Sequence, residues 1–230
     1  MMKKILLLVT ALALTIGATA QEKPFTYGVK AGLSLSQLSS GSAEYTWGSF
    51  DYDATDMLAG FFVSAHFNYS FGQFFGIQPE LSFSMQGGKE SWESLIWEEE
   101  YGGGKTTQTS RYNYINIPVL FEVKPITNLS IFVGPQIGFN IYKSTTWKSE
   151  GWNETISGSD FDDYLGQIDR KFNSVDFAAV VGLQYAILGK YLISARYNIG
   201  FSTVIGSDID NVSISGGDNR VLQFGIGYQF

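Results

Sequence analysis

The stretch that decides the fold is Asn219-Arg220-Val221-Leu222-Gln223-Phe224-Gly225-Ile226-Gly227-Tyr228-Gln229-Phe230, at the end of the printed sequence. Successive side chains of a β-strand point to opposite faces, so every second residue belongs to the same face. The apolar face of this stretch holds Leu222, Phe224, Ile226, Tyr228 and Phe230, and the other face holds Gln223, Gly225, Gly227 and Gln229. The pattern predicts a strand with one wholly apolar side and one small, polar side.

The same alternation recurs along the rest of the chain. It predicts eight strands in total, joined alternately by long and short connections. The expected strands cover residues 25–36, 57–71, 75–86, 115–123, 129–141, 175–187, 191–201 and 219–230. Short turns are expected near residues 72–73, 125–128 and 188–190, with long polar loops at 37–56, 87–110, 142–174 and 203–218. The predicted fold class is all-β, an eight-stranded antiparallel up-and-down β-barrel.

The beginning of the chain has the three parts of a cleavable signal peptide. Lys3 and Lys4 precede an apolar run at residues 5–13, and the small residues Ala18-Thr19-Ala20 precede Gln21. This order predicts a signal peptide at residues 1–20 and one mature domain at residues 21–230. The remaining sequence has no apolar run of the roughly 20 residues that a membrane-spanning helix needs. If this chain is embedded in a membrane, it has to be a closed barrel.

Composition favours a β-rich chain over a soluble enzyme. The sequence is 16% aromatic and only 16% charged, and it contains 26 glycines. Aromatic side chains that face lipid account for such a composition. The net charge is −7, and loss of Lys3 and Lys4 with the signal leaves 13 basic and 22 acidic residues, or −9. Nucleic acid is therefore not expected as a partner.

A soluble β-sandwich or lipocalin-like barrel shows the same alternation with its apolar face turned inward. Three features favour a membrane barrel instead: the signal peptide, the alternation of long and short connections, and the terminal aromatic residue Phe230. Outer-membrane barrels have short turns on the periplasmic side and longer loops outside. We expect the chain to lie in the cell outer membrane, in contact with its lipid, with both termini in the periplasm.

The last strand also resembles the C-terminal signal by which outer-membrane barrels are recognised for insertion. The residues that carry this resemblance are Phe224, Ile226, Tyr228 and Phe230. It implies that the barrel-assembly machinery is a partner and binds this strand.

Three prolines fall inside expected strands, namely Pro79, Pro118 and Pro135. Proline removes a hydrogen-bond donor from a strand and is normally kept to sheet edges or bulges. Because a closed barrel has no edge, we expect each of the three to mark a bulge or a strained pairing.

Four segments resemble the PorT-like outer-membrane β-barrel family. They are Tyr27-Gly28-Val29-Lys30-Ala31-Gly32-Leu33-Ser34, Gln78-Pro79-Glu80-Leu81-Ser82-Phe83-Ser84-Met85-Gln86-Gly87-Gly88-Lys89, Asn113-Tyr114-Ile115-Asn116-Ile117-Pro118-Val119-Leu120 and Gly134-Pro135-Gln136. The resemblance spans the mature chain except its long loops, and it implies an eight-stranded barrel in which the prolines belong to the pattern. It implies no catalytic residue. Some relatives are tied to protein secretion and gliding.

The polar face of the expected barrel carries five charged residues, Lys30, Glu80, Glu122, Lys124 and Arg196. A barrel of about eight strands has an interior filled by side chains. Lys30, Glu80 and Arg196 lie near the middle of their strands, and an unpaired charge at that depth is costly. We expect Glu80 to pair with Arg196, Lys30 or both, as a structural plug. The alternative is a narrow, gated ion path, since charges at membrane depth often mark conduction routes.

An enzyme that modifies lipid is the alternative class of function. Nucleophilic catalysis needs a serine, a base and an orienting acid in contact. His66 is the one histidine of the chain, with Ser64 and Ser70 nearby on the same face. It falls in the periplasmic half of its strand, so we interpret it as a buried, hydrogen-bonded histidine. The chain is not expected to be an enzyme, and no catalytic residue, cofactor or metal site is predicted.

The long connections carry most of the exposed charge. Their acidic residues are Asp51, Asp53, Asp56, Glu90, Glu93, Glu98, Glu99, Glu100, Asp160, Asp162 and Asp163, and their tryptophans are Trp47, Trp92, Trp97, Trp147 and Trp152. One interpretation is a solvated surface with aromatic side chains at the headgroup level. The other is a contact surface for an extracellular or envelope protein, a glycan or a divalent cation. The overall expectation is a structural, binding or accessory role in the envelope, with a link to protein secretion.

Overall fold

The computed structural model describes residues 24–45, 48–93, 105–149, 152–167, 170–207 and 213–230. The expected signal peptide at residues 1–20 lies outside these residues. So do Trp47, Trp97 and the acidic run Glu98 to Glu100. In the described part of the chain, no helix has the length and apolar character to cross a membrane.

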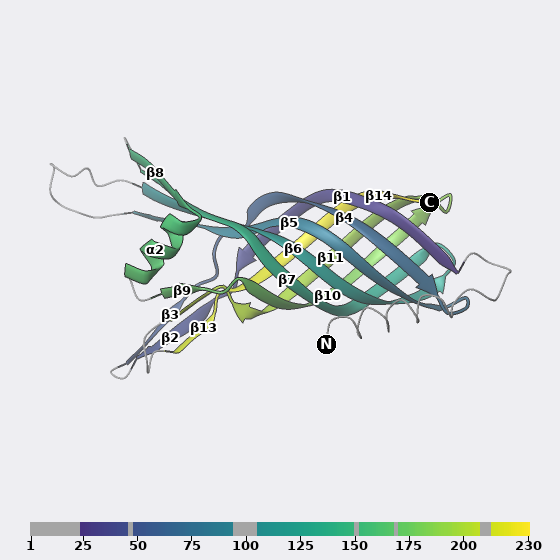
Figure 1. Ribbon diagram of the computed structural model, residues 1–230, viewed down its shortest axis with the longest axis horizontal. Coiled ribbons are helices and arrows are strands. Elements are labelled where there is room, and N and C mark those ends of the chain that lie inside the picture. The colour runs from purple at the N-terminus through teal and green to yellow at the C-terminus, as the bar shows by residue number, and fades with distance from the viewer. Residues whose placement is uncertain (1–23, 46–47, 94–104, 150–151, 168–169, 208–212) are drawn as a thin grey trace, which may run out of the picture.

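The centre of the molecule is an antiparallel sheet that closes on itself (Figure 1). The strands of this ring are β1 (Phe25–Leu38), β4 (Leu58–Ser70), β5 (Phe75–Glu93), β6 (Lys105–Ile126), β7 (Leu129–Ser149), β10 (Val175–Ile187), β11 (Tyr191–Thr203) and β14 (Asp218–Gln229). They pair in the order β10-β11-β14-β1-β4-β5-β6-β7, and β7 pairs again with β10. The prediction of an all-β, antiparallel fold is confirmed.

Further strands lie in the connections at one end of the ring. β8 (Trp152–Ser157) pairs with β7, while β2 (Gly41–Tyr45), β3 (Gly48–Tyr52) and β13 (Ser213–Gly216) form a small sheet. β9 (Arg170–Phe172) pairs with β12 (Ile205–Ser207), and a helix, α2 (Ser159–Gln167), lies beside them. The chain therefore has more strands than the eight expected, because segments interpreted as polar loops pair with each other.

Three strands of the ring continue far beyond their expected ends. β5, β6 and β7 remain paired through residues 93, 105 and 149, past the expected ends at 86, 115 and 141. Their outer parts carry threonine, lysine and serine where the inner parts carry apolar residues, so the alternation of apolar and polar residues disappears. Backbone pairing continues without it, as in Glu93 opposite Lys105 and Thr107 opposite Lys148.

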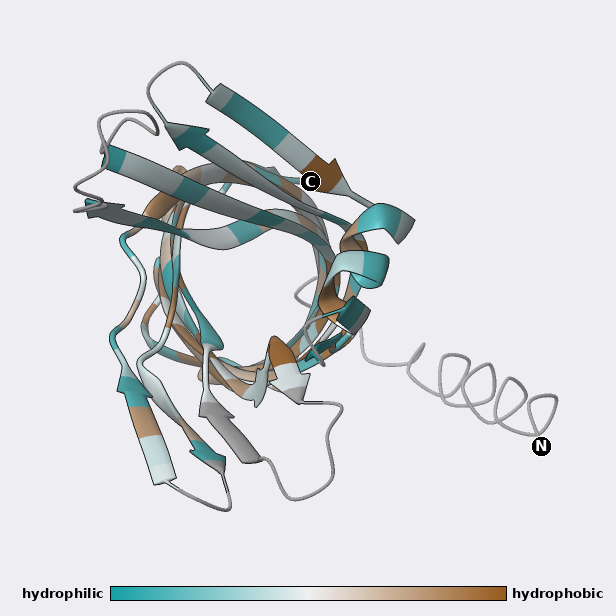
Figure 2. Cartoon of the chain, turned by 90° about the vertical axis from the view of Figure 1, so that its left-hand side faces the viewer, coloured by the Kyte–Doolittle hydropathy of each residue, from teal (hydrophilic) through white to brown (hydrophobic). Residues whose placement is uncertain are grey.

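The side chains of the ring are arranged as in a barrel surrounded by lipid, with apolar side chains outside and charged side chains inside. Phe224 and Ile226 are 47% and 72% exposed on the outer face, whereas Glu80 and Arg196 are only 3% and 6% exposed inside. A soluble barrel has the reverse arrangement. Figure 2, which looks along the ring from the end with the long connections, shows hydrophobic residues concentrated in the ring and hydrophilic residues in the strands that project from it.

Of the two expectations for the prolines, a bulge or a strained pairing, the bulge is wrong. The register of β5 with β6 is the same on both sides of Pro79, and that of β7 with β10 continues unchanged through Pro135. The shifts between β6 and β7 lie between Asn113 and Tyr114 and between Val123 and Ile126, away from Pro118. A proline lacks one N–H but keeps its carbonyl, and two consecutive pairings are missing from β5–β6 and from β6–β7 near the prolines without a change of register.

Candidate functional site

The carboxylate of Glu80 lies at the centre of the barrel between two cations. Nζ of Lys30 on β1 is 2.6 Å from Oε1 of Glu80 on β5. The guanidinium of Arg196 on β11 donates two hydrogen bonds of 2.9 Å, from Nη1 to Oε2 and from Nη2 to Oε1. The side chains of Lys30 and Glu80 are completely buried and that of Arg196 is 6% exposed. Glu80 thus connects β5 to β1 and β11 across the interior.

A second charged group lies closer to the short turns. Nζ of Lys124 is 3.3 Å from Oε2 of Glu122, and Lys124 also donates to Oγ of Ser70 at 2.9 Å. Glu122 is buried, whereas the side chain of Lys124 is 24% exposed. A cavity of about 700 Å³ at this end of the barrel is lined in part by Lys124 and Ser70. This pair is therefore within reach of solvent.

Amide side chains join the two charged groups into one network. Asn68 donates to Oε2 of Glu122 at 2.6 Å and to Oε1 of Gln78 at 3.3 Å. Gln78 in turn donates to Oε1 of Glu80 at 2.6 Å, and Lys30 donates to Oε1 of Gln184 at 3.4 Å. Asn68, Gln78 and Gln184 are not among the site residues that the sequence predicts. Their inward positions, such as Gln78 two residues before Glu80, are the signal that could have identified them.

Apolar groups fill the interior around the network. Phe62, which interrupts the polar face of its strand, is 1% exposed, and Leu120, Phe132 and Val180 form a small buried cluster. Nζ of Lys30 lies 6.0 Å from the centroid of the Phe132 ring. An eight-stranded ring is just wide enough for side chains to fill it, and the arrangement has the character of a packed core with buried ion pairs.

A hydrophobic cluster covers the interior at the end with the long connections. Phe161 and Leu165 of α2 pack with Tyr112 and Tyr114 of β6 and with Phe172 of β9. The ring centroids of Tyr112 and Phe172 are 5.2 Å apart. Lys143 forms an ion pair with Asp162 of the same helix and lies 4.7 Å from the Phe172 ring centroid. α2 is thereby held against the ring.

His66 is buried in the interior, but the expectation that it is hydrogen-bonded is wrong. Neither ring nitrogen has a hydrogen-bond partner among the described residues, and the same holds for Oγ of Ser64. A Cβ atom on Gly28 would lie 2.6 Å from Cε1 of His66, so the imidazole packs against the bare backbone of β1. His66 and Ser64 therefore do not form the contact that nucleophilic catalysis requires.

The acidic surface of the long connections is exposed in the described part. Asp51, Asp53, Asp56, Glu90, Glu93, Asp160, Asp162 and Asp163 are all at the surface. Trp92 and Trp152 are 43% and 49% exposed, whereas Trp147 donates to Gln108 and packs edge-on against Tyr164. No group of three or more metal-ligating side chains of the His, Cys, Asp or Glu type occurs in the residues that the structure describes.

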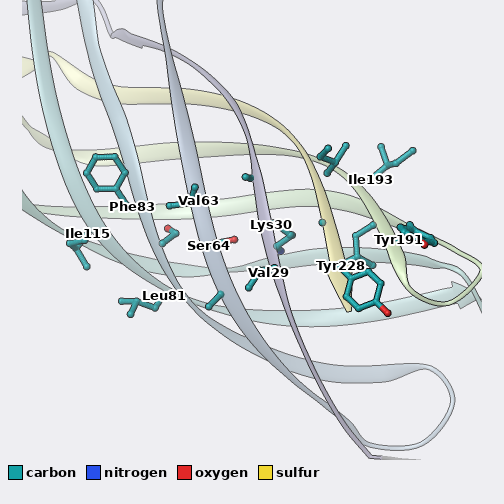
Figure 3. A pocket seen from close by; sticks show the side chains of 16 residues that line it. Val29, Lys30, Val63, Ser64, Leu81, Phe83, Ile115, Tyr191, Ile193 and Tyr228 are labelled. Atoms are coloured by element: carbon teal, nitrogen blue, oxygen red, sulfur yellow. The ribbon is translucent and has the colours of Figure 1, made fainter. Parts of the chain in front are cut away.

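The outer wall of the ring is apolar over several strands. A shallow depression of about 850 Å³ is lined by residues of β1, β4, β5, β6, β11 and β14, among them Val63, Leu81 and Ile193 (Figure 3). At the end with the short turns, the rings of Tyr27 and Phe230 stack at 5.2 Å, and Tyr228 packs edge-on against Phe230 at 5.0 Å. The terminal residues Phe224, Ile226, Tyr228 and Phe230 thus lie on the outer wall.

Comparison with known proteins identifies one family. The family described as "Outer membrane protein beta-barrel domain" matches residues 19–206. Solved structures that resemble this chain include Ail of Yersinia pestis, with 16% identity, 89% of this chain and 98% of that chain covered, and a TM-score of 0.44. OprG of Pseudomonas aeruginosa has 13% identity, 91% and 97% coverage and a TM-score of 0.39. The protease OmpT of Escherichia coli has 9% identity, 92% and 99% coverage and a TM-score of 0.38. No curated protein matches the chain.

Replacement of Glu80 by glutamine is expected to destabilise the barrel by about 3–5 kcal/mol, because Lys30 and Arg196 then remain buried without a counter-charge. The measurement is urea unfolding of the protein in phosphatidylcholine vesicles. Glu122→Gln is the matched control and is expected to cost about 1 kcal/mol or less, since Lys124 can turn to solvent. Equal stability of wild type and Glu80→Gln would show that the ion pairs do not hold the interior together.

Proposed function

We propose, because this chain belongs to the outer membrane protein beta-barrel domain family, that it crosses the outer membrane as an eight-stranded barrel. The spanning strands are those of the closed ring, β1, β4, β5, β6, β7, β10, β11 and β14. The short turns and both termini face the periplasm, and the long connections face outward. The exposed apolar wall supports this proposal, as do the aromatic residues at the end with the short turns, a position that suits a membrane interface.

The proposed role is that of a structural, binding or accessory barrel of the envelope. The observation that carries it is the pairing of Glu80 with both Lys30 and Arg196 in a packed interior, which leaves the centre of the barrel to side chains. The exposed connections are then the part that meets a partner. Within the family we assign the chain to the PorT-like branch on the segments quoted above, with an accessory role in protein secretion. Its terminal strand, with Phe224, Ile226, Tyr228 and Phe230, is the part that the barrel-assembly machinery binds.

The enzyme and pore alternatives have less support. His66 and Ser64 are buried and not hydrogen-bonded to each other, so no activated nucleophile is present at this position. An ion path would have to pass the carboxylate of Glu80, which lies 2.6 Å from Lys30 and 2.9 Å from Arg196. We therefore propose that the protein is not an enzyme and does not conduct.

Membrane insertion predicts a strong dependence on depth for charges on the outer wall. Val63 of β4 is 45% exposed and neighbours Ser64, the residue opposite Lys30 at the centre of the barrel. Val63→Arg is expected to lower the free energy of unfolding in phosphatidylcholine vesicles by about 2–4 kcal/mol. Met57→Arg, at an exposed position just before β4, is the control and is expected to cost about 1 kcal/mol or less. Equal effects of the two substitutions would contradict insertion of this wall into lipid.

A closed interior predicts a flat current trace. Wild-type protein in a planar lipid bilayer is expected to show no stepwise conductance, because the ion pairs of Glu80 occupy the centre. Discrete steps that change in amplitude or ion selectivity in Glu80→Gln would reject the plug and favour a narrow pore.

An accessory role predicts a defined partner for the exposed connections. Full-length protein crosslinked in intact envelopes is expected to purify with a reproducible component of a secretion complex. The variant Asp51→Asn/Asp53→Asn/Asp160→Asn keeps the barrel intact and is expected to lose that component. Retention of the same component by the variant would show that the contact lies elsewhere. Absence of the component from both samples would contradict the accessory role and favour the enzyme or pore alternatives.

A further inference from the structure

The projecting part of the barrel wall carries a cluster of cations on its outer face. β5, β6 and β7 run on beyond the ring (Figure 1). Lys89, Lys105, Arg111 and Lys148 line a groove of about 600 Å³ there, together with hydroxyl side chains such as Thr107 and Thr109. We call this set of four cations the basic groove. No sequence motif predicts the basic groove, because its residues come from three different strands.

The strand register places these residues on one face. Lys89 of β5 is opposite Thr109 of β6, and Lys148 of β7 is opposite Thr107. Directly opposed residues of antiparallel strands project to the same side. On β6, Lys105, Thr107, Thr109 and Arg111 follow at intervals of two, which also places them on one side.

The cations of the basic groove form no ion pair with any residue that the structure describes. Ion pairs with carboxylates are formed by Lys30, Lys124, Lys143, Arg196 and Arg220. Within the described ranges, none of the four groove cations forms an ion pair, and all four are exposed. Two carboxylates border the groove: Asp56 pairs through its backbone with Lys89, and Glu93 is opposite Lys105. Among the described residues, the groove therefore holds more cations than carboxylates, in a chain whose net charge is −7.

The groove continues the face of the barrel that meets lipid. On β6 the outward positions change from Ile117 and Ile115 through Asn113 to Arg111. At about 3.3 Å per residue, Arg111 is about 13 Å along the strand from Ile115. The polar headgroup region adds roughly 5–8 Å to each side of the hydrocarbon core. With the tilt of barrel strands, the groove begins close to the outer limit of that region.

We propose that the basic groove binds the phosphate-bearing headgroup of a glycolipid in the outer leaflet, an inference that rests on the proposed membrane orientation. Arginine binds phosphate through two parallel hydrogen bonds, lysine supplies a point charge, and the threonine hydroxyls donate further hydrogen bonds. A lipid source follows from position, since the acyl chains of such a molecule lie along the apolar wall directly below. Each cation near an anionic headgroup is expected to contribute about fivefold in affinity.

The test measures binding of lipid A, a glycolipid with two phosphates, to folded full-length protein in maltoside micelles by microscale thermophoresis. Arg111→Gln/Lys148→Gln is expected to weaken binding about 25-fold. Lys171→Gln/Lys190→Gln removes the same charge from exposed positions outside the groove and is expected to change it less than twofold. Enzymatically dephosphorylated lipid A is expected to bind wild type as weakly as lipid A binds the groove variant.

The inference would be overturned if the groove variant and the control variant bound lipid A equally well. It would also be overturned if phosphorylated and dephosphorylated lipid A bound equally well. Competition by inorganic phosphate with the same affinity as lipid A would assign the groove to a soluble anion instead. Gel migration of heated and unheated samples verifies that each variant is folded. Failure of the proposed function is separate, because it appears in the Val63→Arg and Met57→Arg comparison in vesicles. If those two variants differ as expected and the groove variants do not, only the groove assignment fails.

Discussion

The carboxylate of Glu80 is the group on which the interior of this barrel depends. Its single negative charge is shared by Lys30 and Arg196, two buried cations that no other carboxylate contacts within 4 Å in the described part of the chain. Burial of an ion is costly, and mutual attraction compensates only when the geometry is good and the remaining polar atoms are hydrogen-bonded. Glu80 meets both conditions through the two-pronged contact with Arg196 and the additional donor Gln78. The closed ring and its internal charges therefore require each other.

The terminal strand connects this interior to the outer wall. Its glycines lie against large inward side chains of other strands. A Cβ atom on Gly227 would lie 2.7 Å from Cγ of Lys30, and one on Gly225 would lie 2.6 Å from Cζ of Phe62. The small, polar face of β14 thus gives room to the stem of Lys30 and to the Phe62 ring. Its apolar face, with Phe224 and Ile226, stays exposed on the outside. The alternating pattern of β14 therefore provides both an apolar face for lipid and a small, polar face that packs in the interior.

The sequence predicts those parts of the structure in which one residue period persists. The alternation of apolar and polar residues identified the ring strands and placed Lys30, Glu80 and Arg196 on the inside. It does so because an apolar outer wall and a polar interior require different residues at every second position. It did not identify the projecting parts of β5 to β7, where both faces are polar. It also missed α2, which has only Phe161 and Leu165 as buried residues, too few to stand out in an acidic segment. The amides that join the charged groups were missed because Asn68 and Gln78 gain meaning only from cross-strand neighbours.

The distribution of charge separates three surfaces with different demands. Inside, Lys30, Arg196 and Glu80 form ion pairs, because low dielectric makes isolated charge costly. At the tips of the connections, carboxylates such as Asp51 and Asp53 are exposed to solvent, where their repulsion is weak and screened. On the outer face of the projecting sheet, beyond the apolar wall, lie cations that form no ion pair within the described ranges. Neither burial nor solvation explains why Arg111 and Lys148 lie there with no ion pair to a described residue. The proposed contact with phosphate-bearing headgroups would supply a counter-charge at the height where the wall ceases to be apolar.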